Sequence, residues 1–274
     1  DDTLIVMHPY FDLPGPLVIG HRGSAGSRPE NTLVSFEQAL ADGAHILESD
    51  IHLSRDGIPI LLHDPMLDRT TDGRGEASRL DLADLKRLDA GYHFEDESGE
   101  RPYRSRGIRI ATLEEAFSAF PEARFNLEIK SADPRATAAT LDLVARYDRA
   151  ERTLLTAGED PVMRILREAL GRHAVVPAVS ACLGEIVAAI QSALTGDPMP
   201  EGVMALQIPP VFAERPLVTR ELVEHAHGHG VAVHVWTIND LEEIGTLLDL
   251  GVDGIVTDHP GRMTEWLARD GARR

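Results

Sequence analysis

The chain has 274 residues, of which 43% are hydrophobic, and this length suits one large α/β barrel or two smaller domains. Its formal net charge of −18 opposes binding to nucleic-acid backbones or anionic membrane surfaces, and no apolar run approaches the length of a membrane span. We therefore expect no nucleic-acid partner and no stable membrane association, while the oligomeric state is unknown at this stage.

The N-terminus, from Asp1 to Met7, lacks the basic region that opens a signal peptide. Cys182 is the single cysteine, so an internal disulfide framework is excluded. A cytoplasmic location is the default expectation for such a chain, although secreted proteins without disulfides also exist. The sequence does not begin with methionine, so the true start and any targeting segment stay open.

A first strand and helix are predicted in residues 17–42. Residues 17–20 are a short apolar strand that ends at His21-Arg22-Gly23, and a polar loop follows. Asn31 is predicted to cap the next helix, because apolar residues recur at helical spacing directly after it. Gly43 then ends this helix.

Residues 46–64 contain the most informative group of candidate functional residues. Glu48 and Asp50 lie two residues apart near the end of an apolar run, so in a strand both side chains leave the same face. Asp56-Gly57 lies between two short apolar stretches and predicts a hairpin, which would bring His63 back toward the acids. Two acids and a histidine can hold a hard metal ion beside a proton donor. The alternative is an exposed strand rim.

Residues 66–109 differ in character from the rest of the chain. They are rich in Asp, Arg and Gly, and only Leu80, Leu82, Leu85 and Leu88 offer a short apolar face. So long a stretch without a strong core signal is usually functional inside a compact domain. We interpret it as an insertion that caps the active-site mouth, with a flexible surface loop as the alternative.

After the insertion, strands and helices alternate to the end of the chain, and Asp133 and Asn239 are predicted to cap two of these helices. With the hairpin counted as decoration, the main strands are predicted to begin near residues 17, 46, 124, 153, 174, 203, 231 and 254. This alternation favours an α/β fold, a (β/α)8 TIM barrel built as a single domain over residues 1–274, with the insertion after the hairpin that follows strand 2. A doubly wound open sheet is the alternative, but no Gly-x-Gly-x-x-Gly follows the first strand.

In such a barrel, functional side chains collect at the C-terminal ends of the strands. Carboxylates there suit Mg²⁺ or Ca²⁺, Arg and Lys beside a hard cation suit a phosphate group, and two histidines can act as acid and base across phosphorus. The residues predicted at these ends are His21, Arg22, Glu48, Asp50, Glu128, Lys130, Trp236 and Asp258, with His63 on the hairpin.

The sequence resembles the glycerophosphodiester phosphodiesterase family from about residue 17 to 260. A lone His-Arg-Gly would be a weak signal, but a long series of motifs in the right order is specific. Ala111 and His52 depart from the usual family residues at positions away from the expected ligands. The matching motifs are His21-Arg22-Gly23, Pro29-Glu30-Asn31-Thr32, Glu48-x-Asp50, Asp56-Gly57, His63-Asp64, Leu67-Asp68-Arg69-Thr70-Thr71, Glu128-Ile129-Lys130, Val235-Trp236-Thr237-Ile238-Asn239 and Asp253-Gly254-Ile255-Val256-Thr257-Asp258.

The resemblance implies a phospholipase-C-like phosphodiesterase barrel that hydrolyses small-molecule glycerophosphodiesters to sn-glycerol 3-phosphate and an alcohol. It also implies one divalent metal ion, Mg²⁺ or Ca²⁺. Carried over by position, the expected roles are metal binding for Glu48, Asp50 and Glu128, acid/base catalysis for His21 and His63, phosphate binding for Arg22 and Lys130, and substrate packing for Trp236.

Two other functions remain open at this stage. A lysophospholipase D-type lipid phosphodiesterase would need an apolar rim for an acyl chain, and the largely polar insertion offers only Tyr92, Phe94 and Tyr103. A non-catalytic binding barrel should have lost an acid or a histidine, whereas every expected site position is filled. Among single residues, we expect Asn31 to be structural and Asp258 to order the last loop.

Overall fold

The computed structural model describes residues 7–270, so the signal-peptide prediction for the N-terminus falls largely outside the described residues. None of the helices in this range has both the length and the apolar character needed to cross a bilayer. The strands are β1 (Leu17–Gly20), β2 (Ile46–Leu53), β3 (Pro59–Leu61), β4 (Arg124–Ile129), β5 (Thr153–Thr156), β6 (Ala178–Val179), β7 (Ala205–Ile208), β8 (Val211–Phe212), β9 (Arg215–Pro216), β10 (Ala232–Val235) and β11 (Gly254–Thr257). The α-helices are α1 (Leu33–Ala41), α2 (Leu82–Leu85), α3 (Leu113–Ala119), α4 (Pro134–Arg146), α5 (Asp160–Leu170), α6 (Leu183–Thr195), α7 (Arg220–Gly228), α8 (Leu241–Leu250) and α9 (Pro260–Asp270), and the 3₁₀ turns are η1 (Pro9–Phe11), η2 (Ala77–Arg79) and η3 (Ala150–Arg152).

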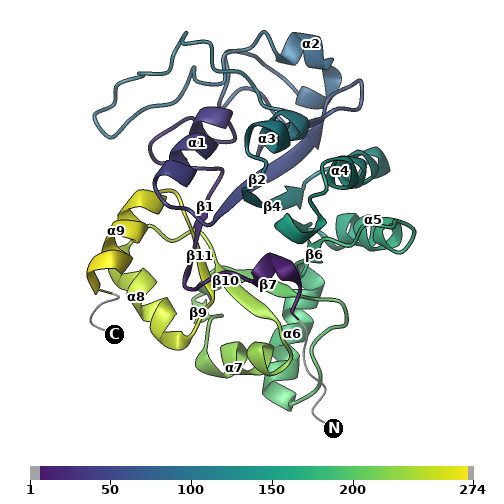
Figure 1. Ribbon diagram of the computed structural model, residues 1–274, viewed down its shortest axis with the longest axis vertical. Helices are drawn as coiled ribbons and strands as arrows, with labels where there is room; N and C mark the ends of the chain where they lie inside the picture. Colours follow the sequence, from purple (N-terminus) through teal and green to yellow (C-terminus); the bar gives the residue numbers. More distant parts are fainter. Residues whose placement is uncertain (1–6, 271–274) are drawn as a thin grey trace.

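Eight parallel strands of the described chain form a barrel, in the ring order β1-β2-β4-β5-β6-β7-β10-β11. The ring closes between β6 and β7, where Ser180 bridges to Ala205 and the Ala181 amide donates to the Ala205 carbonyl at 2.9 Å. Figure 1 shows the helices arranged around this ring of strands. The (β/α)8 TIM barrel predicted from the sequence is therefore confirmed.

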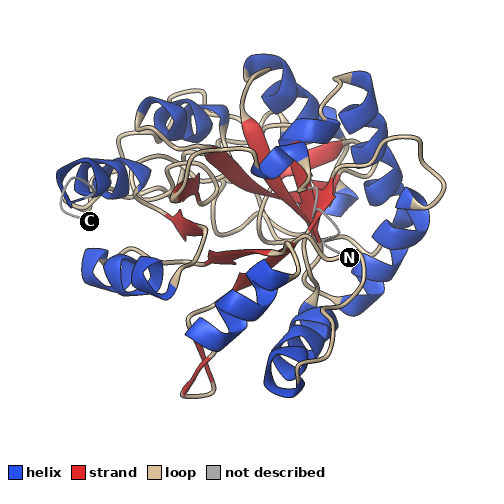
Figure 2. Ribbon diagram, turned by 60° about the horizontal axis from the view of Figure 1, so that its bottom comes forward, coloured by secondary structure: helices blue, strands red, loops and turns tan. Residues whose placement is uncertain are grey.

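Two elements differ from the sequence prediction for clear local reasons. Strand β6 begins at Ala178 rather than near 174, because Pro177 has no N–H to donate to a neighbouring strand. The β8–β9 hairpin was not predicted, and Figure 2 shows it extending beyond the surrounding helices as two short red strands. Its turn residues, Ala213 and Glu214, both have positive φ, a conformation that Asn-Gly usually signals and that these residues do not.

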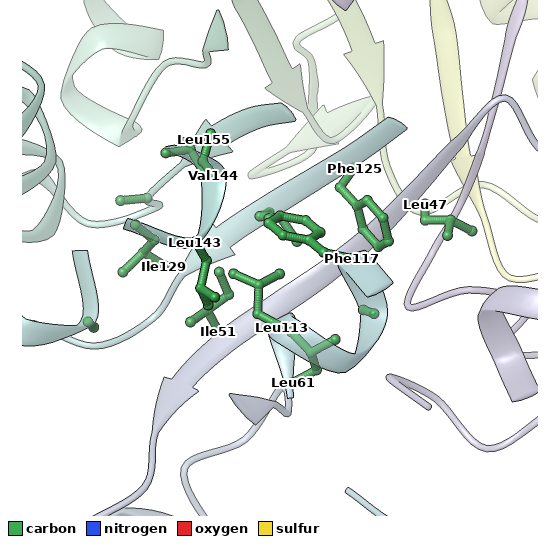
Figure 3. Packing of buried hydrophobic residues seen from close by; sticks show 14 of the residues in the cluster. Leu47, Ile51, Leu61, Leu113, Phe117, Phe125, Ile129, Leu143, Val144 and Leu155 are labelled. Carbon is green, nitrogen blue, oxygen red and sulfur yellow. The ribbon is translucent and has the colours of Figure 1, made fainter. Parts of the chain in front are cut away.

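The two faces of each barrel strand have different roles. On β2, Leu47 and Ile51 face outward and pack with Phe125 of β4 and Phe117 of α3 in a cluster of fully buried side chains (Figure 3). Burial of each such side chain contributes about 1.5–3 kcal/mol. The alternate residues of β2 face the barrel interior, beginning with Ile46, so the period-two pattern places Glu48 and Asp50 on that same inner face.

The insertion has a small hydrophobic core of its own. Leu67 and Leu85 are fully buried and cluster with Ile60 of β3, and the four predicted leucines of the 80–88 face contribute to this cluster. The insertion, drawn in blue and teal at the top of Figure 1, is thus packed against the β2–β3 hairpin. A wholly flexible surface loop is therefore excluded for this part of the insertion, while the proposed cap over the mouth remains a prediction.

His234 lies inside the barrel as a buried neutral histidine. Its side chain is 1% exposed, and neither ring nitrogen has a hydrogen-bond partner among the described residues. Burial lowers its pKa to about 4, against the opposing effect of the nearby Asp253 carboxylate.

This burial predicts a pH-dependent loss of stability. In the unfolded chain the pKa of His234 returns to about 6.5, so between pH 6.5 and 4 the unfolded state binds more protons than the folded state. Stability from this residue is complete above pH 6.5 and falls below it, by at most about 1.4 kcal/mol per pH unit. Urea unfolding at pH 7.5 and 5.0 should show a smaller pH effect in His234→Leu than in the wild type. Equal losses in the two proteins would contradict a buried neutral histidine.

Candidate active site

His21 is the first residue after β1, and it contacts Asp258, the first residue after β11. The register of these parallel strands aligns Gly20 with Thr257, which places the two following side chains together. His21 Nδ1 lies 2.6 Å from Asp258 Oδ1. Burial acts to lower the pKa of His21, but the Asp258 hydrogen bond and the Glu48 charge outweigh it and raise the pKa overall. With Nδ1–H donated to Asp258, Nε2 is the nitrogen left for chemistry.

Asp258 is itself held by Asn239. The Asn239 amide donates to Asp258 Oδ2 at 2.7 Å, and its carbonyl oxygen accepts from the Asp258 backbone at 2.9 Å. The predicted helix cap at Asn239 is wrong, because Asp240 caps α8 instead. Asp258, which was expected only to order the last loop, thus also lies against His21.

Three predicted metal ligands lie on two neighbouring strands. Parallel β2 and β4 align Asp50 with Glu128, and Glu48 precedes Asp50 by one inward position. Glu48 accepts a hydrogen bond from the Arg22 backbone amide at 2.8 Å. Burial and the neighbouring Asp50 carboxylate raise the pKa of Glu48 to about 7. The barrel therefore places several carboxylates at one edge, where burial and mutual repulsion disfavour their ionised forms. A cation bound nearby would stabilise the ionised carboxylates.

Two side-chain cations contact these acids in the structure. Lys130 Nζ lies 2.6 Å from Glu128 and 3.3 Å from Asp50, and Arg22 Nε lies 3.6 Å from Asp50. Burial opposes the charge on both cations, but Glu30 and Asp50 raise the pKa of Arg22, and Asp50 and Glu128 raise that of Lys130. Within residues 7–270 no three His, Cys, Asp or Glu side chains are arranged closely enough to hold a metal ion. The carboxylate oxygens of these acids nevertheless match the donor chemistry that a hard cation prefers.

Asn31 orients Asp50 rather than capping a helix. Its amide donates to Asp50 Oδ2 at 3.1 Å, and its carbonyl oxygen accepts from Ser49 Oγ at 2.6 Å. The residue is 2% exposed and has φ +57°, a left-handed conformation that asparagine tolerates. Thr32 caps α1 instead. The helix cap was thus predicted one residue too early, and the Asn31 side chain faces the acids instead.

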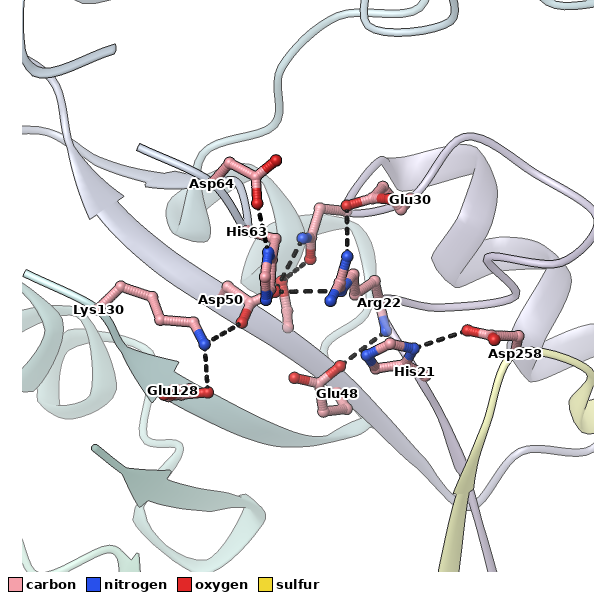
Figure 4. Close-up of polar contacts among 12 residues, drawn as sticks. His21, Arg22, Glu30, Glu48, Asp50, His63, Asp64, Glu128, Lys130 and Asp258 are labelled. Carbon is pink, nitrogen blue, oxygen red and sulfur yellow. Dashed lines mark hydrogen bonds and ion pairs between the residues drawn. The ribbon is translucent and has the colours of Figure 1, made fainter. Parts of the chain in front are cut away.

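The predicted hairpin at Asp56-Gly57 is confirmed and brings His63 to Asp50. Strands β2 and β3 pair antiparallel, and the Leu62 amide donates to the Asp50 carbonyl at 3.1 Å. His63 Nδ1 lies 2.7 Å from Asp64 Oδ1 (Figure 4). Like His21, this histidine therefore contacts a carboxylate through Nδ1, which leaves Nε2 for chemistry. Asp64 is part of the His63-Asp64 motif, but its contact with His63 is apparent only in the structure.

Trp236 follows β10, the strand beside β11. Its side chain is 44% exposed, and its backbone amide donates to the Ile208 carbonyl at 3.2 Å. Substrate contact for Trp236 remains a prediction. Figure 4 shows the other predicted residues of the strand ends, Asp258 included, together with His63.

Comparisons with known proteins match almost the whole chain. The sequence model of the glycerophosphoryl diester phosphodiesterase family matches residues 21–262. A glycerophosphodiester phosphodiesterase of Caldanaerobacter subterraneus subsp. tengcongensis is 30% identical over 260 residues, which cover 93% of this chain and 99% of the relative. Lysophospholipase D GDPD1 of Rattus norvegicus is 27% identical over 278 residues, covering 91% and 85% of the two chains.

A solved structure agrees with these sequence matches. A phosphodiesterase from Oleispira antarctica, in complex with the product sn-glycerol-3-phosphate, superposes with a TM-score of 0.78. It is 29% identical, and the match covers 95% of this chain and 99% of the other. Together with the two histidines and the gathered acids, these matches confirm the resemblance inferred from the motifs: the chain belongs to the glycerophosphoryl diester phosphodiesterase family.

Proposed function

We propose that this chain hydrolyses glycerophosphodiesters to sn-glycerol 3-phosphate and an alcohol, with His21 and His63 transferring the protons and one divalent cation at the acids. As a member of its family the chain is an enzyme, a phosphoric diester hydrolase. The observation that carries the proposal is the pair of histidines that each contact an aspartate, at 2.6 and 2.7 Å, beside the buried Asp50 and a group of half-buried acids and cations. The product complex of the Oleispira relative supports the same substrate class.

The proposed reaction needs two proton transfers. One histidine Nε2 removes a proton from the nucleophile, whose oxygen forms a new bond to phosphorus. The bond between phosphorus and the alcohol oxygen breaks, and the second histidine gives that oxygen a proton. The nucleophile is either water, which gives sn-glycerol 3-phosphate directly, or the glycerol 2-hydroxyl. The second route gives a cyclic phosphate, and water must then attack phosphorus, break its bond to the 2-oxygen and leave that oxygen protonated. Arg22 and Lys130 would hold the phosphate oxygens.

The divalent cation is part of this proposal. Glu48, Asp50 and Glu128 would hold Mg²⁺ or Ca²⁺, both of which prefer carboxylate oxygens. A cation bound there would neutralise charge on the phosphoryl oxygens. The buried, high-pKa carboxyl of Glu48 supports the site, because a divalent charge nearby offsets the cost that burial imposes on the ionised acid.

One feature favours a lysophospholipase D-type activity as a second candidate. Strands β6, β7 and β10 are consecutive in the ring, and exposed apolar residues follow their C-terminal ends. In the ring order β7 lies opposite β2, so this apolar rim faces the polar insertion across the barrel. Such a rim can receive an acyl chain. The rim residues are Leu183, Val211, Phe212 and Trp236.

A substrate panel tests both candidates. Purified protein should release alcohol from glycerophosphocholine, glycerophosphoethanolamine and bis-glycerophosphate, and EDTA should abolish the release until Mg²⁺ or Ca²⁺ is restored. A lysophosphatidylcholine arm, below its micellar concentration, measures the lipid activity. Faster turnover of the lipid would favour the second candidate, and no release from any diester would contradict the proposal.

A further inference from the structure

Arg69 belongs to the Leu67–Thr71 motif of the insertion, which the proposed reaction leaves without a role. The backbone of this motif is fixed. Leu67 is fully buried, and its carbonyl accepts from the Thr71 amide at 3.1 Å and from Thr71 Oγ1 at 2.8 Å. Asp68 Oδ2 accepts from the Gly75 amide at 2.8 Å. The turn therefore holds the base of the Arg69 side chain at a defined place beside the barrel.

The guanidinium of Arg69 uses all three of its nitrogens. Nη1 and Nη2 donate to the two oxygens of Glu30 at 2.7 and 2.8 Å, a bidentate pair. Nε donates to Asp64 Oδ2. Because the guanidinium is planar and presents its donors in a fixed fork, these bonds set the relative position of the two carboxylates.

Each of these carboxylates has a second partner at the site. Asp64 lies against His63 Nδ1 at 2.7 Å, and Glu30 accepts from Arg22 Nη1 at 2.8 Å (Figure 4). Arg69 thus connects the proposed proton-transfer histidine with the proposed phosphate-binding arginine. These two residues enter the site from the hairpin and from the end of β1.

Stability alone is a weak explanation for this arrangement. The side chains of Arg69 and Asp64 are 46% and 31% exposed, and an exposed ion pair contributes about 0–1 kcal/mol. The electrostatic effect on the acids is clear in direction. Although burial acts to raise their pKa values, hydrogen bonds from Arg69 help to lower the pKa of Glu30 and bring that of Asp64 to about 2. Both acids stay ionised and continue to accept from their site partners.

We propose that Arg69 is a positioning residue, which holds Asp64 against His63 and Glu30 against Arg22, so that the insertion fixes the geometry of the active site. The proposal rests on the proposed function, because it takes the roles of His63 and Arg22 from that reaction. It goes beyond that function by giving the insertion a part in turnover.

Steady-state kinetics on glycerophosphocholine test this role. Arg69→Ala should lower kcat by about 10–100-fold, a range typical for loss of a partner that orients a functional ligand, and should also raise KM. The kcat of Arg69→Lys should lie between those of the wild type and Arg69→Ala, because a single ammonium group cannot donate to both carboxylates as the planar guanidinium does. Arg79→Ala is the matched control, since Arg79 pairs with Glu76 at 2.9 Å in the same insertion, away from these contacts.

Two further variants separate the arms of the network. Asp64→Asn should mainly lower kcat through His63, and Glu30→Gln should mainly raise KM through Arg22. The double variant Arg69→Ala/Asp64→Asn should lose less than the product of the single losses, because both act on one contact. A merely structural role would predict no division between kcat and KM among the variants, and that result would overturn the proposal.

The controls separate this proposal from the proposed function. A wild-type protein that releases no product would overturn both. If the wild type is active and Arg69→Ala behaves like Arg79→Ala, that result would overturn only the positioning role. Thermal unfolding of each variant reports whether a loss follows from the site or from the fold, and a large fall in the Tm of Arg69→Ala and Arg69→Lys together would also contradict it.

Discussion

Replacement of either His21 or His63 by alanine should lower kcat by at least about 10²–10⁴-fold, the usual contribution of a positioned acid or base, with little change in KM. A leaving alkoxide is far more basic than neutral water can stabilise, so its protonation limits the reaction. The structure supports this expectation, because Asp258 and Asp64 each fix one ring nitrogen and leave the other free.

The leaving group separates the two roles. A p-nitrophenyl ester needs no proton at its leaving oxygen, so it should rescue the variant that lacks the acid and leave the variant that lacks the base inactive. We propose His63 as the acid and His21 as the base, although the resemblance implies only the pair. Equal rescue of both variants, or of neither, would contradict this division of labour.

His227→Ala is the matched control for these variants. His227 also pairs with an aspartate, Asp253, at 2.9 Å, but this pair lies at the N-terminal end of the barrel strands. The variant should retain wild-type kcat. A loss as large as those at His21 and His63 would show that removal of any His–Asp pair damages the fold.

Glu48→Gln and Glu128→Gln should each lower kcat by at least about 10²–10³-fold, as expected when a preorganised electrostatic group is removed. Both should also weaken binding of Mg²⁺ or Ca²⁺ measured by calorimetry on the otherwise folded protein. Glutamine keeps the shape of the side chain and removes its charge, so the loss reports on the charge itself.

The control for the acids is Glu265→Gln. Glu265 pairs with Arg269 at 3.0 Å on the exposed surface of α9, far from the barrel edge that carries the acids. This variant should bind the cation and turn over as the wild type does. Unchanged cation binding in both site variants would remove Glu48 and Glu128 from the metal site.

The sequence predicted the fold well because its signals are local and periodic. Glu48 and Asp50 share a face because a strand repeats every two residues, and Asp56-Gly57 marks a hairpin because Gly57 readily adopts the positive φ of the turn. The predicted cap at Asp133 is also confirmed, since its side chain accepts from the Arg135 amide at 2.9 Å. The resemblance to a known family then supplied the roles that periodicity cannot assign.

The errors arose where several polar residues follow one another or where contacts are distant in the sequence. Asn31 and Asn239 each precede the true cap by one residue. The local sequence pattern does not distinguish a capping side chain from an adjacent polar side chain that hydrogen-bonds to another part of the fold. His21 and Asp258 are 237 positions apart, and only the closed barrel brings them together. Arg69 lies in a motif of the family, but its partners Glu30 and Asp64 become apparent only in the structure.

The most direct test of the central proposal is the identity of the phosphorus-containing product. Phosphorus NMR of glycerophosphocholine incubated with the protein and Mg²⁺ or Ca²⁺ should show conversion to sn-glycerol 3-phosphate, which EDTA prevents. Appearance of phosphocholine would show that the other phosphoester bond breaks, and persistence of the diester with either cation would show that the chain lacks the activity. Either result would contradict the account.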